Sequence, residues 1–336
     1  MRGDAGQEVT INGATQETAR NSSSPSGRGE FTIELSLVHA GPTAVLVRYE
    51  LVGREGSPLV LVAGGISAGR HVAENPSDES DGWWQSQARS FESRRVLAID
   101  WVGADGMLDR AIDPSDQARA LIATLDHLGL SSAAAFVGAS YGGMVGMHLA
   151  AIAPNRVGAL LAISAADRAH PFATALRATQ RQAIELGERL GAPEAGVALA
   201  RKLAIISYRT PQEFAGRFSA PVTIEQGRAQ ASSESYLDHM GRRHSDRMSA
   251  AAYRRLSESI DLHRMDPALI TIPSTFVAAL SDQLVPAEDI EACARAAPRG
   301  RFISIPSLYG HDAFLKEERT IGEILTNFLN PLENQQ

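Results

Sequence analysis

Short apolar runs separated by helical stretches restrict the fold of this chain more than any other feature. Six runs rich in Val, Ile, Leu and Ala are apolar on both faces instead of alternating, which is typical of strands in a mostly parallel sheet covered by helices on each side. They are "SPLVLVAGG", "RRVLAIDW", "AAAFVGAS", "RVGALLAIS", "PSTFVAALSD" and "GRFISIPS". The 336 residues are 44% hydrophobic and can bury a sizeable core, in one large α/β domain or two small ones.

Breaks in this pattern predict the domain organisation. Two earlier runs, "FTIELSLVH" and "AVLVRYELVG", predict an antiparallel hairpin that leads into the sheet. From about residue 166 to 269 the strand pattern stops, and long segments rich in Ala, Arg, Leu and Glu predict a helical lid inserted into a core of residues 31–165 and 270–332. Residues 1–30 are rich in Ser, Gly, Gln and Asn and are predicted to be a disordered tail. The cleft between core and lid is the expected site.

Charge and cysteine content exclude several classes of protein. A net charge of -7 and a pI near 5.7 argue against nucleic acid as a partner, because surfaces that bind it carry excess Lys and Arg. No apolar stretch approaches the roughly 18 to 20 residues of a membrane span, so no membrane partner is expected. The single cysteine, Cys293, excludes a disulfide framework and all-cysteine metal sites, and it favours a cytoplasmic location. No metal ion is predicted.

Residues 138–142, "GASYG", match the GxSxG nucleophile elbow. A predicted strand precedes the motif and a predicted amphipathic helix, "GGMVGMHLAAIA", follows it, as the elbow requires. The turn forces Ser140 into a strained conformation, and side chains at Gly138 and Gly142 would collide there. The sequence therefore predicts that Ser140 is a nucleophile rather than an ordinary serine in a tight turn.

A nucleophilic serine needs a base, and the base needs a carboxylate to fix its tautomer. In this fold class the order along the chain is Ser, acid, His. Asp282 follows a late strand in "FVAALSDQLVP", and His311 follows the last strand in "IPSLYGHDAF". Because both lie at carboxyl ends of strands, where open sheets gather their active sites, we expect Asp282 and His311 to complete a catalytic triad with Ser140. The alternative for Asp282 is a loop aspartate that caps the following helix.

An acyl-transfer site also needs backbone N–H donors for the oxyanion. The first predicted donor is Tyr141, the residue after the nucleophile. The second lies in "VAGGISAGRHV", after an early strand, with Ile66 as the expected donor. This glycine run fits neither GxGxxG nor GxxxxGK[ST], so a phosphate-binding loop is disfavoured.

Motifs outside the elbow narrow the activity. The segments "VRYELVG", "GGISAGRHVA" with "GWW", "QRQAI", "GVALARKLAIISYRTPQEFAGRF", "ESYLDH" and "SDQLVP…YGHDAFL" together resemble the homoserine O-acyltransferases. These are α/β-hydrolase-fold enzymes of methionine biosynthesis, and the resemblance spans nearly all of residues 31–330. It implies that Ser140, Asp282 and His311 are catalytic, with Ile66 and Tyr141 as oxyanion donors.

The same resemblance implies the substrates and their binding residues. Arg201, Tyr208 and Asp312 are implied to hold the amino-acid acceptor, homoserine, whose carboxylate and ammonium groups need a guanidinium and a separate carboxylate. Acyl-CoA is the implied co-substrate, no bound cofactor is expected, and a homodimer packed through lid helices is implied. Arg177 lies one helical turn before Arg181 and favours succinyl-CoA over acetyl-CoA, although a lid-surface position is the alternative.

Two departures from the family keep other functions open. The stretch "AIDWVGADGMLDRAIDPSDQ" is shorter than usual and lacks a cysteine and a glycine-rich segment, which makes serine an alternative acceptor. The lid lacks a tryptophan-containing insertion after "QRQAI". An esterase or thioesterase with a retained lid is the second hypothesis, and a non-catalytic binding protein is the third.

Overall fold

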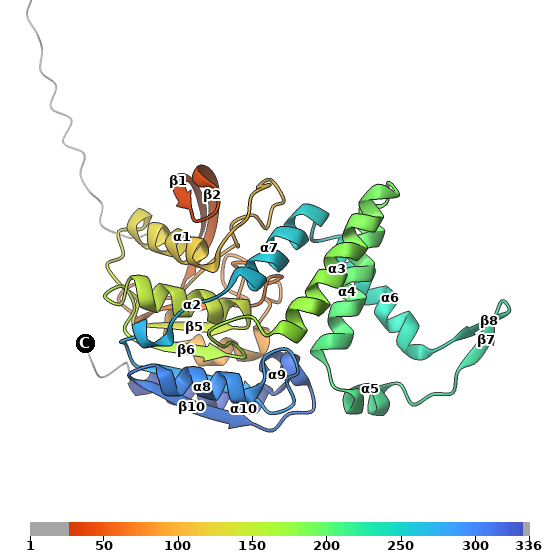
Figure 1. Ribbon diagram of the computed structural model, residues 1–336. Helices are drawn as coiled ribbons and strands as arrows, with labels where there is room; N and C mark the ends of the chain where they lie inside the picture. The colour runs from red at the N-terminus through yellow and green to blue at the C-terminus, as the bar shows by residue number, and fades with distance from the viewer. Residues whose placement is uncertain (1–26, 332–336) are drawn as a thin grey trace, which may run out of the picture.

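The computed structural model describes residues 27 to 331, and its centre is an eight-stranded sheet in the order β1-β2-β4-β3-β5-β6-β9-β10 (Figure 1). The strands are β1 (Gly27–Leu37), β2 (Gly41–Val52), β3 (Leu59–Ala63), β4 (Arg95–Ile99), β5 (Ala135–Ala139), β6 (Leu160–Ile163), β9 (Ser274–Ala279) and β10 (Gly300–Ile305). All neighbours from β4 to β10 are parallel. The β1–β2 hairpin is antiparallel, and β2 runs antiparallel to β4. The predicted mostly parallel sheet with a leading hairpin is confirmed.

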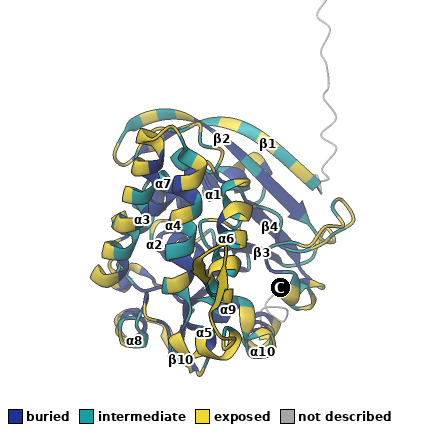
Figure 2. Ribbon diagram, turned by 90° about the vertical axis from the view of Figure 1, so that its right-hand side faces the viewer, coloured by how far each residue is buried: buried dark blue, intermediate teal, exposed yellow. Residues whose placement is uncertain are grey.

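Both faces of β3, β4, β5 and β6 are buried, as the doubly apolar runs predict, whereas the edge strand β10 is largely exposed or half-buried (Figure 2). In β3, Leu61 belongs to one core cluster, while its neighbours Val60 and Val62 belong to the cluster on the opposite face. Helices α1 (Pro114–His127), α2 (Tyr141–Ile152) and α8 (Ala287–Ala296) cover the first face. The short helix η1 (Gln85–Phe91) and α10 (Glu318–Leu329) cover the second. Packing on both faces holds the carboxyl ends of the parallel strands in place, and residues that follow these ends can form a site at that edge of the sheet.

Helix α2 differs from the amphipathic helix that its sequence predicts. Ten of its 12 residues are buried, because α2 packs on β5 and β6 and against the neighbouring helix α1. Small residues bring α2 close to the strands: a Cβ added to Gly146 would lie 2.6 Å from the ring of Phe136. The helix after the elbow is therefore a core helix that is apolar on all sides.

An insertion rich in helices separates β6 from β9 and lies to one side of the sheet (Figure 1). It contains α3 (Pro171–Arg189), α4 (Pro193–Tyr208), α5 (Pro211–Arg217), α6 (Ser232–Ser245) and α7 (Ala250–Leu262). Three short helices of the core complete the described helices: η2 (Pro267–Leu269), η3 (Gly310–Asp312) and α9 (Ala313–Lys316). Residues 171–262 thus lie inside the predicted lid, and below we call them the lid.

The lid also contains a two-stranded hairpin that the sequence analysis missed. Strands β7 (Thr223–Glu225) and β8 (Arg228–Gln230) pair antiparallel around Gln226 and Gly227, both of which have positive φ. Two positive φ values are typical of the tight turns that join hairpin strands. The strands are only three residues long and almost wholly exposed, so they carry none of the apolar alternation from which strands are predicted.

The predicted disordered tail needs a correction at its end. Residues 27–30 form the beginning of β1, where Gly27 pairs with Leu51 and Arg28 with Glu50. The pairing partner lies in β2 and leaves no signal in the local composition. Residues 1–26 of the predicted tail, and residue 332 of the predicted core, lie outside the described residues.

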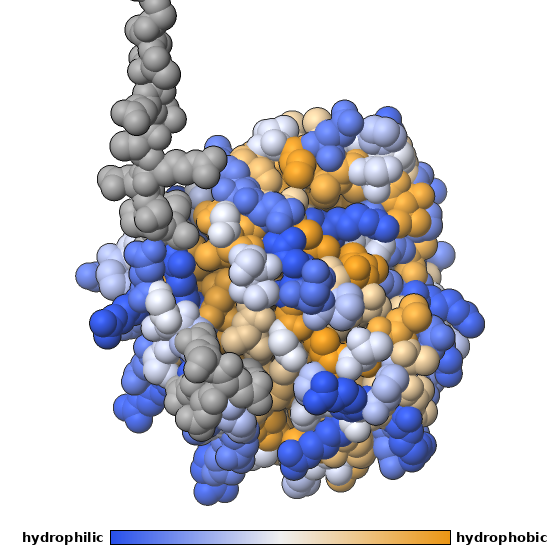
Figure 3. All heavy atoms as spheres, turned by 90° about the vertical axis from the view of Figure 1, so that its left-hand side faces the viewer, coloured by the Kyte–Doolittle hydropathy of each residue, from blue (hydrophilic) through white to orange (hydrophobic). Residues whose placement is uncertain are grey.

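Two surface properties bear on the partners. None of the helices formed by residues 27 to 331 is long and apolar enough to cross a membrane. Figure 3 shows the face turned away from the lid, on which hydrophilic and hydrophobic residues are interspersed.

Candidate active site

Ser140 lies in the sharp turn between β5 and α2. Its backbone has φ 54° and ψ −120°, a strained conformation for a residue with a side chain. A Cβ on Gly138 would lie 2.4 Å from the Gly142 carbonyl oxygen, and a Cβ on Gly142 would lie 2.3 Å from the Ala63 carbonyl oxygen. The two glycines are therefore required by close backbone contacts, as the sequence predicts.

Ser140, His311 and Asp282 form a continuous chain of hydrogen bonds. The Ser140 Oγ lies 2.8 Å from His311 Nε2, and His311 Nδ1 lies 2.7 Å from Asp282 Oδ2. Asp282 comes just after β9, and His311 belongs to η3 after β10, so neighbouring strands deliver acid and base to the same edge of the sheet. The structure thus brings together all three residues predicted from the motif and the chain order.

The surroundings of Asp282 and His311 set the tautomer and the basicity of the imidazole. The other oxygen of Asp282, Oδ1, accepts hydrogen bonds from the backbone N–H groups of Leu284 (2.9 Å) and Val285 (3.1 Å). Because the Asp282 carboxylate accepts, His311 Nδ1 carries hydrogen and Nε2 is free to accept the Ser140 proton. Burial acts to lower the pKa of His311, but the charge and hydrogen bond of Asp282 outweigh it, and the net pKa is raised.

The two predicted oxyanion donors flank the nucleophile. Tyr141 follows Ser140 as the first residue of α2, and Ile66 lies in the loop after β3 and lines the pocket around Ser140. The Gly142 N–H donates to the Gly64 carbonyl at 2.8 Å, which ties this loop to the elbow. Among residues 27–331, no hydrogen bond forms from the backbone N–H of Ile66 or Tyr141, so both remain available to a developing oxyanion.

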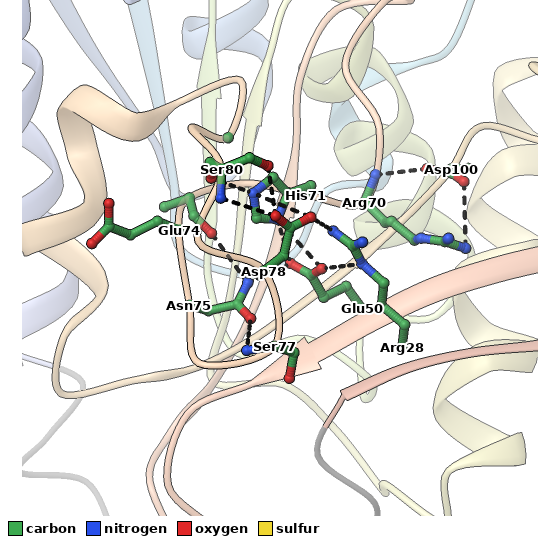
Figure 4. A network of polar contacts seen from close by, with 12 residues as sticks. Arg28, Glu50, Arg70, His71, Glu74, Asn75, Ser77, Asp78, Ser80 and Asp100 are labelled. Atoms are coloured by element: carbon green, nitrogen blue, oxygen red, sulfur yellow. Dashed lines mark hydrogen bonds and ion pairs between the residues drawn. The ribbon is translucent and has the colours of Figure 1, made fainter.

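A polar network holds the loop of residues 64–84 that carries Ile66 (Figure 4). Its centre is Glu50, a buried carboxylate on β2 that accepts hydrogen bonds from Arg28 Nε at 2.6 Å, His71 Nδ1 at 3.1 Å and Asn75 Nδ2 at 3.0 Å. His71 Nε2 also donates to the Ser80 carbonyl at 2.8 Å. With both ring nitrogens donating, His71 is an imidazolium, and its pKa is raised although partial burial opposes this.

A second anchor lies at the start of the same loop. The Arg70 backbone N–H donates to Asp100 Oδ1 at 2.8 Å, and the Arg70 guanidinium lies 3.6 Å from Asp100 Oδ2. Trp101 Nε1 donates to the Gly65 carbonyl at 3.0 Å. The loop is therefore held from β2 and from the end of β4, and these contacts fix the place of Ile66 relative to Ser140.

A pocket of about 250 Å³ opens above Ser140 and His311. It is lined by residues of the core and of the lid, and all four predicted binding residues lie on it: Arg177, Arg201, Tyr208 and Asp312. The Arg201 guanidinium lies 5.6 Å from the centre of the Tyr208 ring, within the range of a cation–π contact. Burial raises the pKa of Tyr208, so its hydroxyl is neutral at neutral pH. The structure thus gathers residues from α3, α4 and η3 around the nucleophile.

Sequence reasoning missed the partner that holds Asp312. Arg209, the residue after α4, donates from Nε to Asp312 Oδ2 at 3.1 Å and from Nη1 to Glu213 Oε1 at 2.9 Å. Arg209 lies within the lid motif that carries the family resemblance, next to Tyr208, and this adjacency was the only available signal. Asp312 therefore faces the pocket with one carboxylate oxygen already bound to a guanidinium.

A second missed residue, Asp261 at the end of α7, binds both arginines of α3. Arg177 Nε donates to Asp261 Oδ1 at 2.6 Å, and Arg181 Nη2 lies 2.8 Å from Asp261 Oδ2. The two arginines lie one turn apart on α3, so a single carboxylate reaches both. Arg177 is therefore a pocket residue held by an ion pair, and not an exposed residue on the surface of the lid.

The described residues contain no group of three or more His, Cys, Asp or Glu side chains arranged to hold a metal ion. The chemistry that this geometry supports is nucleophilic attack by an activated serine on an acyl group, in a pocket with one basic and one acidic wall.

Comparisons with known proteins show the fold and the family to which this chain is similar. The model of the "alpha/beta hydrolase fold" family matches residues 58–318. The homoserine O-succinyltransferase of Xanthomonas campestris is 47% identical over 91% of this chain and 84% of its own length. The homoserine O-acetyltransferase of Thermus thermophilus is 38% identical over 85% of this chain and 86% of its own. A solved homoserine O-acetyltransferase from Bacillus anthracis has the same fold, with a TM-score of 0.79 over 90% of this chain and 97% of its own at 16% identity.

Proposed function

Because this chain belongs to the homoserine O-acyltransferase family, within the α/β-hydrolase fold, we propose that it transfers an acyl group from acyl-CoA to the side-chain hydroxyl of homoserine. The observation that carries the proposal is the shared pocket, in which the hydrogen-bonded Ser140 and His311 lie beside Arg201 and Asp312. A hydrolase needs only the first two residues. The second two supply a cation and an anion at the places where an amino-acid acceptor would need them.

The reaction would proceed in two half-reactions. His311 Nε2 takes the proton of Ser140 as the Oγ attacks the thioester carbonyl, and the N–H groups of Ile66 and Tyr141 stabilise the oxyanion. The C–S bond then breaks, His311 protonates the leaving thiolate, and CoA departs from an acyl-serine. In the second half, His311 deprotonates the homoserine hydroxyl as it attacks the acyl-serine carbonyl. The ester bond to Ser140 Oγ then breaks, His311 returns the proton to this oxygen, and O-acylhomoserine departs.

Charge complementarity supports homoserine as the acceptor. Its carboxylate would pair with the Arg201 guanidinium, and its ammonium would lie against Asp312, whose position is fixed by Arg209. A bound acceptor would place its hydroxyl near His311 at a high effective concentration relative to water. Serine has the same two charged groups and a shorter side chain. Because the stretch after β4 is shorter than is usual in the family, serine is the second acceptor to test.

Arg177 supports succinyl-CoA as the donor. Its guanidinium lines the pocket, and a succinyl group carries a distal carboxylate that an acetyl group lacks. Asp261 holds Arg177 through Nε and thereby sets the direction of the guanidinium. The expected consequence is that Arg177→Leu lowers kcat/KM for succinyl-CoA much more than for acetyl-CoA.

The assay that tests the function measures thiol release from purified protein. Succinyl-CoA and acetyl-CoA are each supplied with homoserine, with serine or without acceptor. Acceptor-dependent release that is lost in Ser140→Ala supports the proposal. If the rate of thiol release is the same with and without either acceptor, and is unchanged in Arg201→Ala, the protein is instead a thioesterase.

We also propose a homodimer that packs through the lid. Apolar side chains on the outer parts of α3 and α4 are exposed, and Leu190, next to α3, has 73% of its surface accessible. Other members of this apolar set are Leu186, Leu199 and Ile206. Light scattering of the purified protein, compared with a Leu186→Glu/Leu199→Glu variant, tests this assembly.

A cytoplasmic location remains the proposal that fits a single, buried cysteine.

A further inference from the structure

A second pocket, of about 200 Å³, lies next to the active-site pocket and is lined mainly by basic residues. Ser67 and Arg201 line both pockets, so one wall is common to them. The remaining lining residues come from the end of α6 and the segment after it: Met240, Arg243, His244, Arg247 and Met248. A ligand that reaches Ser140 through the lid can therefore extend into a positively charged recess.

The arginines of this basic pocket have no acidic partners among residues 27–331. Within the described part of the chain, Arg201, Arg243 and Arg247 form no ion pair, although the protein carries a net charge of -7 and most other lid arginines are paired. Arg243 and Arg247 are four residues apart, at the end of α6 and just beyond it. Positive charge at the C-terminal end of a helix is stabilised by the helix dipole. The dipole of α6 does not explain why Arg201, which belongs to α4, lines the same pocket.

His244 supplies independent support. Its Nε2 is buried and has no hydrogen-bond partner among the residues described. Burial, together with the neighbouring charges of Arg201 and Arg247, lowers the pKa of His244 to about 3. The imidazole is therefore neutral, and a buried nitrogen without a partner lies in a residue that lines the positively charged pocket.

The backbone holds this pocket in place before any ligand binds. Helix α6 packs closely on α4 at Gly241, where an added Cβ would lie 2.8 Å from the Ala198 carbonyl oxygen. An ion pair between Lys202 and Asp238 joins the same two helices. Because α4 carries Arg201 and α6 carries Arg243, these contacts fix the spacing between the two helices from which the guanidinium groups extend.

We propose that Arg243 and Arg247, with His244 between them, bind the phosphate groups of the acyl-CoA donor while its thioester reaches Ser140. Guanidinium groups bind phosphate oxygens through paired hydrogen bonds, and CoA carries its phosphates at the end remote from the thioester. The inference rests on the proposed function only for the identity of the donor. In this arrangement Arg201, which lines both pockets, lies between the acceptor site and the phosphate site.

The test compares Arg243→Ala/Arg247→Ala with Arg242→Ala. Arg242 is a matched control because it is an exposed arginine of the same helix that does not line the pocket. Titration calorimetry with free CoA is expected to show the affinity of the double variant reduced at least about tenfold, while Arg242→Ala stays within about twofold. Equal melting temperatures of the three proteins show that the fold is kept.

A kinetic arm identifies which part of the donor is recognised. The KM for succinyl-CoA is expected to rise in the double variant, whereas kinetics with the phosphate-free N-acetylcysteamine thioester of the same acyl group stay unchanged. Unaltered CoA affinity in the double variant, or an equal loss in Arg242→Ala, overturns the phosphate site. Because free CoA is titrated without acyl group or acceptor, this result is independent of whether homoserine is the acceptor.

Discussion

The guanidinium of Arg209 lies between two acidic side chains of different elements, and its Nε donates to Asp312 Oδ2 at 3.1 Å. Glu213 on α5 accepts from the same arginine, and both Arg209 and Glu213 are nearly inaccessible to water. Arg209 therefore joins the lid to the residue that follows the catalytic histidine. It is a positioning residue for Asp312, because it acts on the acceptor site through that carboxylate.

We predict that Arg209→Ala lowers the free energy of unfolding by about 3 kcal/mol, because it leaves the buried Glu213 carboxylate without its main partner. It should also raise the KM for homoserine more than it lowers kcat. Arg217→Ala is the control: its side chain is 45% exposed and lies 3.7 Å from Glu213, so its loss should cost less than about 1 kcal/mol. Urea unfolding of both variants measures this, and equal losses would contradict it.

The pH dependence of kcat/KM should report His311. The base must be neutral to accept the Ser140 proton, and its pKa is raised by Asp282. We therefore expect activity to fall on the acid side with a midpoint above about 6.5, the ordinary pKa of histidine. Asp282→Asn should move this midpoint to lower pH and reduce kcat by about 10⁴-fold, as the loss of the acid does in other triads. A midpoint that stays in place in Asp282→Asn would exclude the assigned pair.

Stability should depend on pH through His71. Its pKa is raised in the folded protein, so its contribution is fully present below the unfolded pKa of about 6.5 and is lost as the pH rises through the folded pKa. We predict that wild type exceeds His71→Gln in free energy of unfolding by more at pH 5.5 than at pH 8.5. His239→Gln, which alters an exposed lid histidine, should show no such trend. A pH-independent difference for His71→Gln would mean that its charge is not what stabilises the loop.

Gly142→Ala should abolish activity and destabilise the protein. The new Cβ would lie 2.3 Å from the backbone oxygen of Ala63, which cannot move without displacing β3. The matched control is Gly216→Ala on α5, where nothing lies within 4 Å and the helix should gain up to about 1 kcal/mol. Thermal unfolding and thiol release are the measurements, and a fully active Gly142→Ala would contradict the close approach at the elbow.

The sequence predicts those parts of the site that depend on order along the chain. Ser140 is identified by spacing within five residues, and Asp282 and His311 by the strands that they follow, because carboxyl ends of parallel strands meet at one edge. Arg209 and Asp261 leave no such local signal, since each acts through a partner about 80 to 100 residues away, as the pairs with Arg177 and Asp312 show.

The fold shows the same division. Doubly apolar runs predict the six parallel strands of the main sheet, and two earlier runs predict the β1–β2 hairpin, whereas the exposed β7–β8 hairpin has no apolar pattern from which to predict it. Helix α2 is predicted to be amphipathic, but its residues are apolar on all sides, and packing on the sheet and against α1 buries ten of the 12. The elements that cover it are identified only by the assembled structure.

The position of the lid in the sequence has a consequence for how the protein matures on the ribosome. The strand that precedes Ser140, β5, pairs with β3 and β6, but Asp282 and His311 follow the lid and come after the last two strands, β9 and β10. Ser140 therefore has no base until more than 100 further residues have been synthesised. The triad can form only after β9 has paired with β6 and β10 has paired with β9.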